Sequence, residues 1–477
     1  MAVARDAALR GLSVLLLESG DFASGTSGRS SKLIHGGIRY LESGRLGLVR
    51  EALRERAVLL ENAPEYVRPL PFLIPHYAGD LRSPVRIGIG LALYAALAGR
   101  HGIQGHRRVG AEEAMALEPK LARQGLRGAS LFWDAQMEDA SLCVALAIHA
   151  EAAGAEIRNH ASLVALRREG KVWRARHRCP IDGTEGDAAA RIVVNAAGPW
   201  ADEVRGMALG RVPAASMRRT RGTHVVVSGL PVERAILLTA RRDGRVFFVL
   251  PWGAHTLIGT TDADDDGGPR APRPHPDEIR YLTHEAARAL PMAKGIRPVR
   301  AFAGLRSLVR GAAEHPWANS REHRVLFEEG MFTLIGGKYT THRSLAERVV
   351  DRASAMLGKR AAPCVTARTP VPAGRGAAIE ALRGRFPGRL DLGDGLSLSE
   401  AEVVHAATVE KARRLDDVLL RRTRLWLDGR ALRRAAEPAA SWMAPLLGWS
   451  ESRRREEIER LTRTLDDEER AIEEGTA

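Results

Sequence analysis

The segment TSGRSSKLIHGGIRY, residues Thr26–Tyr40, decides how this chain folds. It follows the apolar segment Leu12–Glu18 (LSVLLLE), which we predict to be a buried strand that ends in an acid. A strand of this kind followed by a hydroxyl-rich loop is typical of α/β folds that bind the ribose and phosphates of a dinucleotide. Lys32 can balance phosphate charge, and a solvated Ser/Gly connector is the alternative interpretation. The phosphate-binding candidates in the loop are Thr26, Ser27, Ser30 and Ser31.

Composition and charge limit the function classes that this chain can belong to. Its 477 residues are enough for two or three domains, and 45% hydrophobic residues indicate a globular protein. The formal charge of +14 suits an anionic ligand, a membrane surface or nucleic acid. Nucleic acid has the least support, because aromatic residues make up only 5% and no recognition module is visible.

The cysteines and the apolar segments argue against metal centres and membrane spans. The three cysteines, Cys143, Cys179 and Cys364, lie far apart and form no CxxC pair, so we expect no metal site and a reduced, cytoplasmic-side protein. No signal peptide is visible. The longest apolar run, Ile87–Gly99, is shorter than the ~20 residues that cross a bilayer. We interpret it as a core helix rather than an interfacial one.

Three later segments extend the α/β pattern. Arg191–Ala196 (RIVVNA) predicts a buried strand, and the small residues Ala197 and Gly198 after it allow close backbone approach. Arg211–Leu250 is rich in β-branched residues and predicts antiparallel strands. Gly330–Thr341 (GMFTLIGGKYTT) predicts a strand, a glycine turn and a helix start.

Six spaced segments together resemble one family. Besides the loop Ser24–Glu42 (SGTSGRSSKLIHGGIRYLE) they are Val193–Asp202 (VVNAAGPWAD), Arg221–Val227 (RGTHVVV), Leu257–Asp262 (LIGTTD), Gly304–Leu308 (GLRSL) and Leu334–Arg343 (LIGGKYTTHR). In this order they resemble the FAD-dependent glycerol-3-phosphate dehydrogenases of the membrane-associated bacterial type. The resemblance covers residues 1–360 and resumes more weakly in the C-terminal helices.

The resemblance implies an α/β fold with a Rossmann-like FAD-binding domain, an antiparallel-sheet substrate domain and a small C-terminal helical domain. The two larger domains would interleave over residues 1–360, with the substrate part at about 70–130 and 205–325. The helical domain would span residues 361–477, and its tail after Ser450 is expected to be a solvated helix.

The resemblance also assigns residues to FAD and to the substrate. His35 is expected to contact the flavin, and Lys338 lies in a turn that can approach the flavin ring. The cofactor-binding residues would be Glu18, Thr26, Ser27, Ser30, Ser31, Lys32, Leu33, His35, Gly36, Gly37, Ala197, Gly198, Gly336, Gly337, Lys338 and Thr340. The substrate-binding residues would be Arg39, Tyr40, Thr260, Arg306 and Arg321, because arginine pairs well with a phosphate group.

His224 and Arg306 are the catalytic candidates. His224 would be the base, although a lone histidine in a valine-rich strand often serves only in packing. The implied reaction oxidises sn-glycerol 3-phosphate to dihydroxyacetone phosphate and passes electrons to membrane quinone. The protein would then lie on the inner face of the cell membrane, peripherally bound to anionic lipid, with a homodimer as one assembly. The alternatives are an oxidase that uses oxygen, a related amine or hydroxy-acid oxidase, and a flavin-free relic.

The start of the sequence suggests a further expectation. Ala2–Arg10 predicts a helix, which in the resembling family follows a first strand and a GxGxxG loop that this sequence lacks. We therefore expect an exposed apolar edge at Leu15 and Leu17, weak FAD binding by this chain, and a natural protein that starts upstream.

Overall fold

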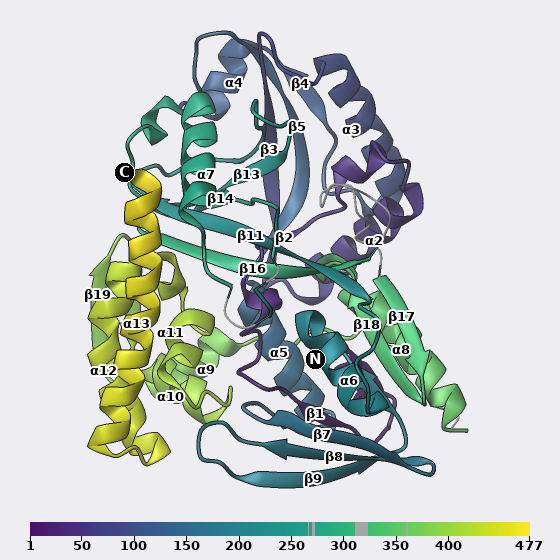
Figure 1. The fold of residues 1–477 in the computed structure, drawn as a ribbon. Coiled ribbons are helices and arrows are strands. Elements are labelled where there is room, and N and C mark those ends of the chain that lie inside the picture. Colours follow the sequence, from purple (N-terminus) through teal and green to yellow (C-terminus); the bar gives the residue numbers. More distant parts are fainter. Residues whose placement is uncertain (266, 270–271, 311–322, 359–360) are drawn as a thin grey trace.

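The computed structural model describes residues 1–265, 267–269, 272–310, 323–358 and 361–477 (Figure 1). A large curled sheet fills one end of the molecule, smaller sheets lie at the other end, and C-terminal helices stand along one side (Figure 1). The expected α/β fold with an antiparallel sheet and a helical C-terminal region is confirmed.

Two short parallel pairings form the core of the smaller end. β1 (Leu15–Leu17) pairs with β6 (Glu156–Arg158), and β10 (Val193–Asn195) pairs with β18 (Met331–Gly336), which also pairs with antiparallel β17 (His323–Glu328). In the part of the chain that the structure describes, β1 and β10 each have one partner strand. Each therefore leaves one edge without ladder hydrogen bonds.

Three helices pack around these strands. α1 (Ala2–Leu9) lies against both α5 (Asp139–Ala152) and α8 (His342–Met356). Alanines of α1 and α5 meet in one buried cluster, because small side chains let the helices approach closely. The helix predicted at the start of the chain is thus present. The remaining elements of this end are β7 (Ser162–Glu169), β8 (Val172–Arg178), β9 (Glu185–Ala190) and α6 (Ala201–Leu209).

The large sheet has ten strands. The antiparallel strands predicted at Arg211–Leu250 lie within it. In spatial order its main path is β15 (Ala263–Asp264), β11 (Met217–Ser228), β14 (His255–Gly259), β13 (Val246–Trp252), β12 (Ala235–Thr239), β3 (Val67–Tyr77), β5 (Leu126–Met137) and β2 (Leu33–Ile34), with β16 (Arg300–Val309) on β11 and β4 (Arg107–Val109) on β5.

Both faces of this sheet are buried. Because side chains alternate along a strand, Val225 and Val227 of β11 pack in the core that contains α7 (Pro276–Ala289), whereas Val226 packs in the opposite core. This explains why β11 contains three consecutive valines. α4 (Ala111–Leu117) lies beside β5.

Helices α2 (Leu46–Asn62) and α3 (Pro84–Ala98) pack together beside the large sheet (Figure 1). Ser83 caps α3, and Pro84 occupies its first turn, where a missing N–H costs nothing. The expectation that the apolar run Ile87–Gly99 forms a core helix is wrong for one face of α3. Only three of its residues are buried, and its outer side is solvent-exposed and apolar.

The C-terminal region adds helices and one hairpin. Its last helix packs along α7, and Glu468 on that helix pairs with Arg300 of β16 at 2.5 Å. The tail is therefore not simply a solvated helix. The elements are α9 (Arg375–Leu382), β19 (Arg389–Gly393), β20 (Leu396–Ser399), α10 (Glu400–Thr408), α11 (Leu415–Arg421), α12 (Gly429–Leu447) and α13 (Glu451–Thr476).

Candidate active site

A cavity of about 2760 Å³ runs between the small strands and the large sheet. Its walls include α1, the edges of β1 and β10, the loop at residues 23–45, and parts of β11, β16 and α3. Leu15 and Leu17 of β1 border it, and Leu15 is 36% exposed, so the expected apolar edge is present. The volume exceeds the usual 300–1,000 Å³ of a small-molecule pocket, which leaves room for a dinucleotide and a substrate together.

Most of the predicted site residues line this cavity. Lys32 and Gly36 do not line it, and Arg321 lies outside the described residues. The predicted residues that do line it are Glu18, Thr26, Ser27, Ser30, Ser31, Leu33, His35, Gly37, Arg39, Tyr40, Ala197, Gly198, His224, Thr260, Arg306, Gly336, Gly337, Lys338 and Thr340.

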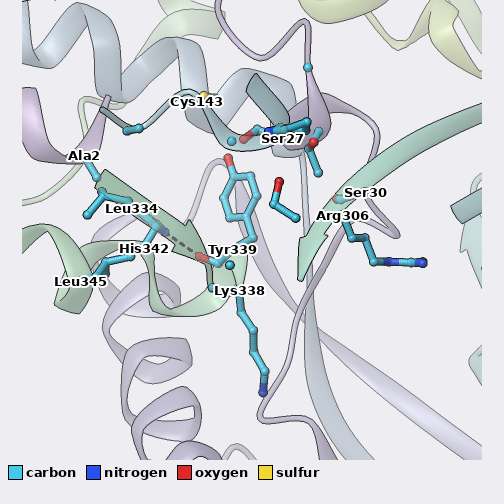
Figure 2. Close-up of a pocket in the computed structure, with 18 of the residues that line it drawn as sticks. Ala2, Ser27, Ser30, Cys143, Arg306, Leu334, Lys338, Tyr339, His342 and Leu345 are labelled. Carbon is cyan, nitrogen blue, oxygen red and sulfur yellow. Dashed lines mark hydrogen bonds between the residues drawn. The ribbon is translucent and has the colours of Figure 1, made fainter. Parts of the chain in front are cut away.

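The hydroxyl-rich loop is attached to the start of α5 and to β16. The Thr26 hydroxyl donates to the Leu305 carbonyl at 2.6 Å, and the Ser30 hydroxyl donates to Asp139 at 2.8 Å. Ser27, Ser30 and Cys143 all line the cavity (Figure 2). These contacts fix the loop that carries most of the cofactor candidates.

Lys32 turns away from the cavity. It is 3% exposed, and its ammonium lies 2.5 Å from Asp139 and 4.1 Å from the centre of the Trp426 ring. The predicted phosphate contact of Lys32 therefore has no geometric support in this arrangement. Lys32 instead joins the loop to α5 and to the C-terminal region.

The glycine turn after β18 brings Lys338 toward the loop. Gly336 and Gly337 both have positive φ, of 72° and 94°, which favours glycine. The turn places the Lys338 ammonium 3.7 Å from the centre of the Tyr40 ring. The Tyr339 carbonyl lies 2.7 Å from Nδ1 of His342 at the start of α8 (Figure 2). The turn and the loop thus face one cavity.

His224 of β11 is buried at the cavity wall, with 2% of its surface exposed. Its ring stacks on Phe302 at 5.0 Å, and Nε2 lies 2.9 Å from the Ser31 hydroxyl. A Cβ at Gly259 would lie 2.3 Å from the imidazole, so this glycine makes room for the ring. Burial lowers the pKa of His224 well below its usual 6.5, and the charges of Arg306 and Lys32 lower it further. The imidazole is therefore neutral at pH 7.

Arg306 of β16 lies in the same part of the cavity. Its guanidinium donates to Asp262 and to the Thr260 hydroxyl, both at 2.9 Å. Burial lowers the pKa of Arg306, the charge of Asp262 opposes this effect, and the charge of Arg39 lowers the pKa further, so two arginines and one carboxylate act on one region. Such a region is suited to an anionic group on the substrate.

A buried charge cluster links the end of β1 to α11. Asp21, which is 1% exposed, accepts hydrogen bonds from Arg422 at 2.5 and 2.9 Å and from Arg421 at 2.6 Å. The two arginines hold the pKa of Asp21 well below its usual range, against the effect of burial. His160 and Asp417 lie near enough to Asp21 for metal binding, but the guanidinium groups occupy its carboxylate oxygens.

Sequence reasoning missed three residues that shape the site. Asp139 holds Ser30 and Lys32, Asp262 holds Arg306, and Phe302 stacks on His224. Asp139 is the first residue of α5, where an acid is common for dipole reasons alone. Nothing in its local sequence indicates its partners.

Two family models and several curated proteins match this chain. The family described as "FAD dependent oxidoreductase" matches residues 1–341, and "C-terminal domain of alpha-glycerophosphate oxidase" matches residues 382–454. Glycerol-3-phosphate dehydrogenase of Mycobacterium leprae is 35% identical over an alignment that covers 94% of this chain and 83% of that protein. The Synechocystis glycerol-3-phosphate dehydrogenase is 38% identical, over 78% of this chain and 71% of its own.

A solved structure shares the fold. The glycerol-3-phosphate dehydrogenase of Bacillus halodurans, complexed with FAD, aligns with a TM-score of 0.76 at 23% identity, over 98% of this chain and 92% of its own. The cavity described above offers hydroxyl donors, a carboxylate at the end of β1 and a lysine in the glycine turn, which fit a flavin dinucleotide. This chain belongs to the family of FAD-dependent glycerol-3-phosphate dehydrogenases.

Proposed function

We propose that this protein oxidises sn-glycerol 3-phosphate to dihydroxyacetone phosphate. The observation that carries the proposal is the placement of a neutral, buried histidine beside two arginines in one cavity. Oxidation of the C2 alcohol removes a hydride from carbon and a proton from oxygen. FAD bound in the cavity supplies the acceptor for the hydride.

The residues divide into three roles. The loop around Thr26–Gly37 and the turn at Gly336–Thr340 would hold FAD. Arg306 and Arg39, with Tyr40, Thr260 and Arg321 as the other expected contacts, would bind the substrate phosphate. His224 would take the hydroxyl proton, with its ring held by Ser31 and Phe302.

The direct test is a flavin absorbance spectrum of the purified protein with and without sn-glycerol 3-phosphate. Because we expect this chain to bind FAD weakly, FAD is supplied in excess, and the absorbance near 450 nm should be lost without air when the substrate is added. A protein that binds no FAD even in excess would favour the flavin-free alternative. A flavin that bleaches with an amine or a hydroxy acid, and not with glycerol 3-phosphate, would favour another substrate class.

We further propose that the electrons pass to a membrane quinone. The matching C-terminal domain takes its name from alpha-glycerophosphate oxidase, so oxygen is the rival acceptor. Stoichiometric hydrogen peroxide during turnover in air would identify an oxidase. Rapid reoxidation by a soluble quinone analogue, with little peroxide, supports the dehydrogenase.

Quinone as acceptor requires contact with a membrane. None of the described helices is long and apolar enough to cross a bilayer. We propose that the protein binds peripherally to the inner face of the cell membrane through anionic lipids, which its +14 charge favours. A homodimer is compatible with this arrangement.

Arg306→Ala is expected to weaken substrate capture and leave FAD binding intact. Loss of a charge-assisted contact costs about 1.5–3 kcal/mol, roughly 10- to 150-fold in kcat/KM. Steady-state kinetics with glycerol 3-phosphate measures this loss. Glycerol, which has no phosphate, should lose much less.

Arg324→Ala is the matched control for this variant, because Arg324 is exposed on β17 and lies outside the cavity. It should behave as wild type. If kcat and KM of Arg306→Ala are both unchanged, Arg306 does not bind the substrate.

The pH dependence of flavin reduction should reflect the lowered pKa of His224. A base must be unprotonated to accept a proton, and a lowered pKa keeps it unprotonated in more acidic solution. In stopped-flow experiments at saturating substrate, the rate should therefore hold as pH falls through 6.5 and decline only below it. A decline centred at or above pH 6.5 would contradict a buried neutral base.

A further inference from the structure

The outer face of α3 is an exposed apolar surface. Val85 is 62% exposed, Ile89 67% and Leu93 39%, and Leu81 just before the helix is 64% exposed. Residues four apart lie on the same side of a helix, so Val85, Ile89 and Leu93 form one stripe, and Leu81 stands before the helix that carries it. Leu91 and Tyr94 face the protein on the opposite side. In Figure 1 α3 lies at the edge of the molecule, next to α2.

The segment that carries this stripe is basic in sequence. Residues 81–110 contain five arginines and two histidines, and no aspartate or glutamate. Glu42 pairs with Arg82 at 3.1 Å and approaches Arg86 at 3.8 Å, and Arg86 keeps 69% of its side chain exposed beside the stripe. Apolar side chains flanked by arginines match the interfacial layer of an anionic bilayer, where the chains enter the acyl boundary and the cations meet the headgroups.

The length of α3 suits a helix that lies in the membrane surface. Fifteen residues at 1.5 Å each give about 22 Å, which is less than the ~30 Å hydrocarbon core. The substrate cavity also reaches this helix, because Ile87, Ile89 and Leu93 line it. A lipid-soluble acceptor could therefore enter the cavity from the bilayer next to α3.

We propose that the exposed face of α3, with Leu81, is the surface that inserts into anionic membranes. This inference rests on the proposed membrane association and names the element responsible for it. Hydrophobic insertion adds to the charge attraction, so part of the binding should survive high salt, unlike binding by charge alone.

The test is flotation of the holoenzyme with vesicles of phosphatidylcholine and phosphatidylglycerol, at low salt and at 1 M salt. We expect wild type to float at low salt and to keep part of its binding at high salt. Leu81→Glu/Val85→Glu should reduce the bound fraction at least tenfold. Neither residue lines the cavity and both are exposed, so the fold and the flavin spectrum should not change.

Val212→Glu/Met292→Glu is the matched control. It adds the same two charges at exposed apolar residues elsewhere, which are 93% and 59% exposed, and it should float like wild type. An α3 variant that floats like wild type overturns the inference while membrane association stands. Wild type that fails to float on anionic vesicles overturns both. If the α3 variant still floats but dissociates in light scattering, the face is a contact between copies of the chain, which also overturns the inference.

Discussion

His224→Gln is expected to slow reduction of the bound flavin by glycerol 3-phosphate about 10²- to 10⁴-fold, the usual contribution of a positioned base. Glutamine fits the space of histidine and can still hydrogen-bond to Ser31, which lies 2.9 Å from Nε2 in the native protein. Its amide cannot accept a proton at pH 7. The variant should therefore keep its FAD and its affinity for substrate, and lose rate in the step that bleaches the flavin. Single-turnover stopped-flow absorbance measures this rate directly.

His76→Gln provides a closely matched control. His76 of β3 is also buried, at 3% exposure, and also lies beside a serine hydroxyl, with Nε2 2.8 Å from Ser130. It does not line the cavity. If both variants lose rate equally, the loss comes from packing in the sheet and not from proton transfer. A near-native rate in His224→Gln would leave His224 a packing residue.

Arg422→Met is expected to lower the free energy of unfolding by about 3–5 kcal/mol, the usual cost of removing one partner from a buried ion pair. Arg422 is 2% exposed and donates to both oxygens of Asp21, so the substitution leaves a buried carboxylate with the hydrogen bonds from Arg421 and Asn159 alone. Denaturant unfolding of the holoenzyme measures the loss. The loop after β1 should also loosen, which predicts faster FAD release from the variant.

Two further variants separate the causes. Arg424→Met removes a more exposed pair with Glu138 and should cost less than about 1 kcal/mol. Asp21→Asn/Arg422→Met removes both charges and should recover part of the stability, whereas no recovery would mean that packing dominates.

Because its pKa is lowered on folding, Asp21 stabilises the protein fully above its unfolded pKa near 3.8, and this contribution is lost as pH falls below that value.

Much of the site could be predicted because its residues lie in short motifs. The loop Thr26–Tyr40, the segment around His224 and the turn at Lys338 each form a contiguous pattern, and the structure brings all three to one cavity. A motif of this kind predicts which segment of the backbone lies near the ligand. It does not predict the direction in which a long side chain points.

Lys32 illustrates that limit. Its place among serines predicts a phosphate contact, but Asp139 and Trp426 engage its ammonium, and they lie 107 and 394 positions later in the chain. The outer face of α3 illustrates another limit of sequence reasoning. The apolar run Ile87–Gly99 predicts a core helix, because its composition does not tell whether other elements cover both sides of the helix.

The link between Asp21 and Arg422 also has a consequence for biosynthesis. The two residues are 401 positions apart, so Asp21 has emerged long before its partner is translated. At about 5–20 residues per second this interval is roughly 20–80 s. During that time the carboxylate lacks its arginine partners, so we expect the loop after β1 to reach its final place late. We therefore expect the cofactor-binding end of the protein to complete its folding only after Arg422 has left the ribosome.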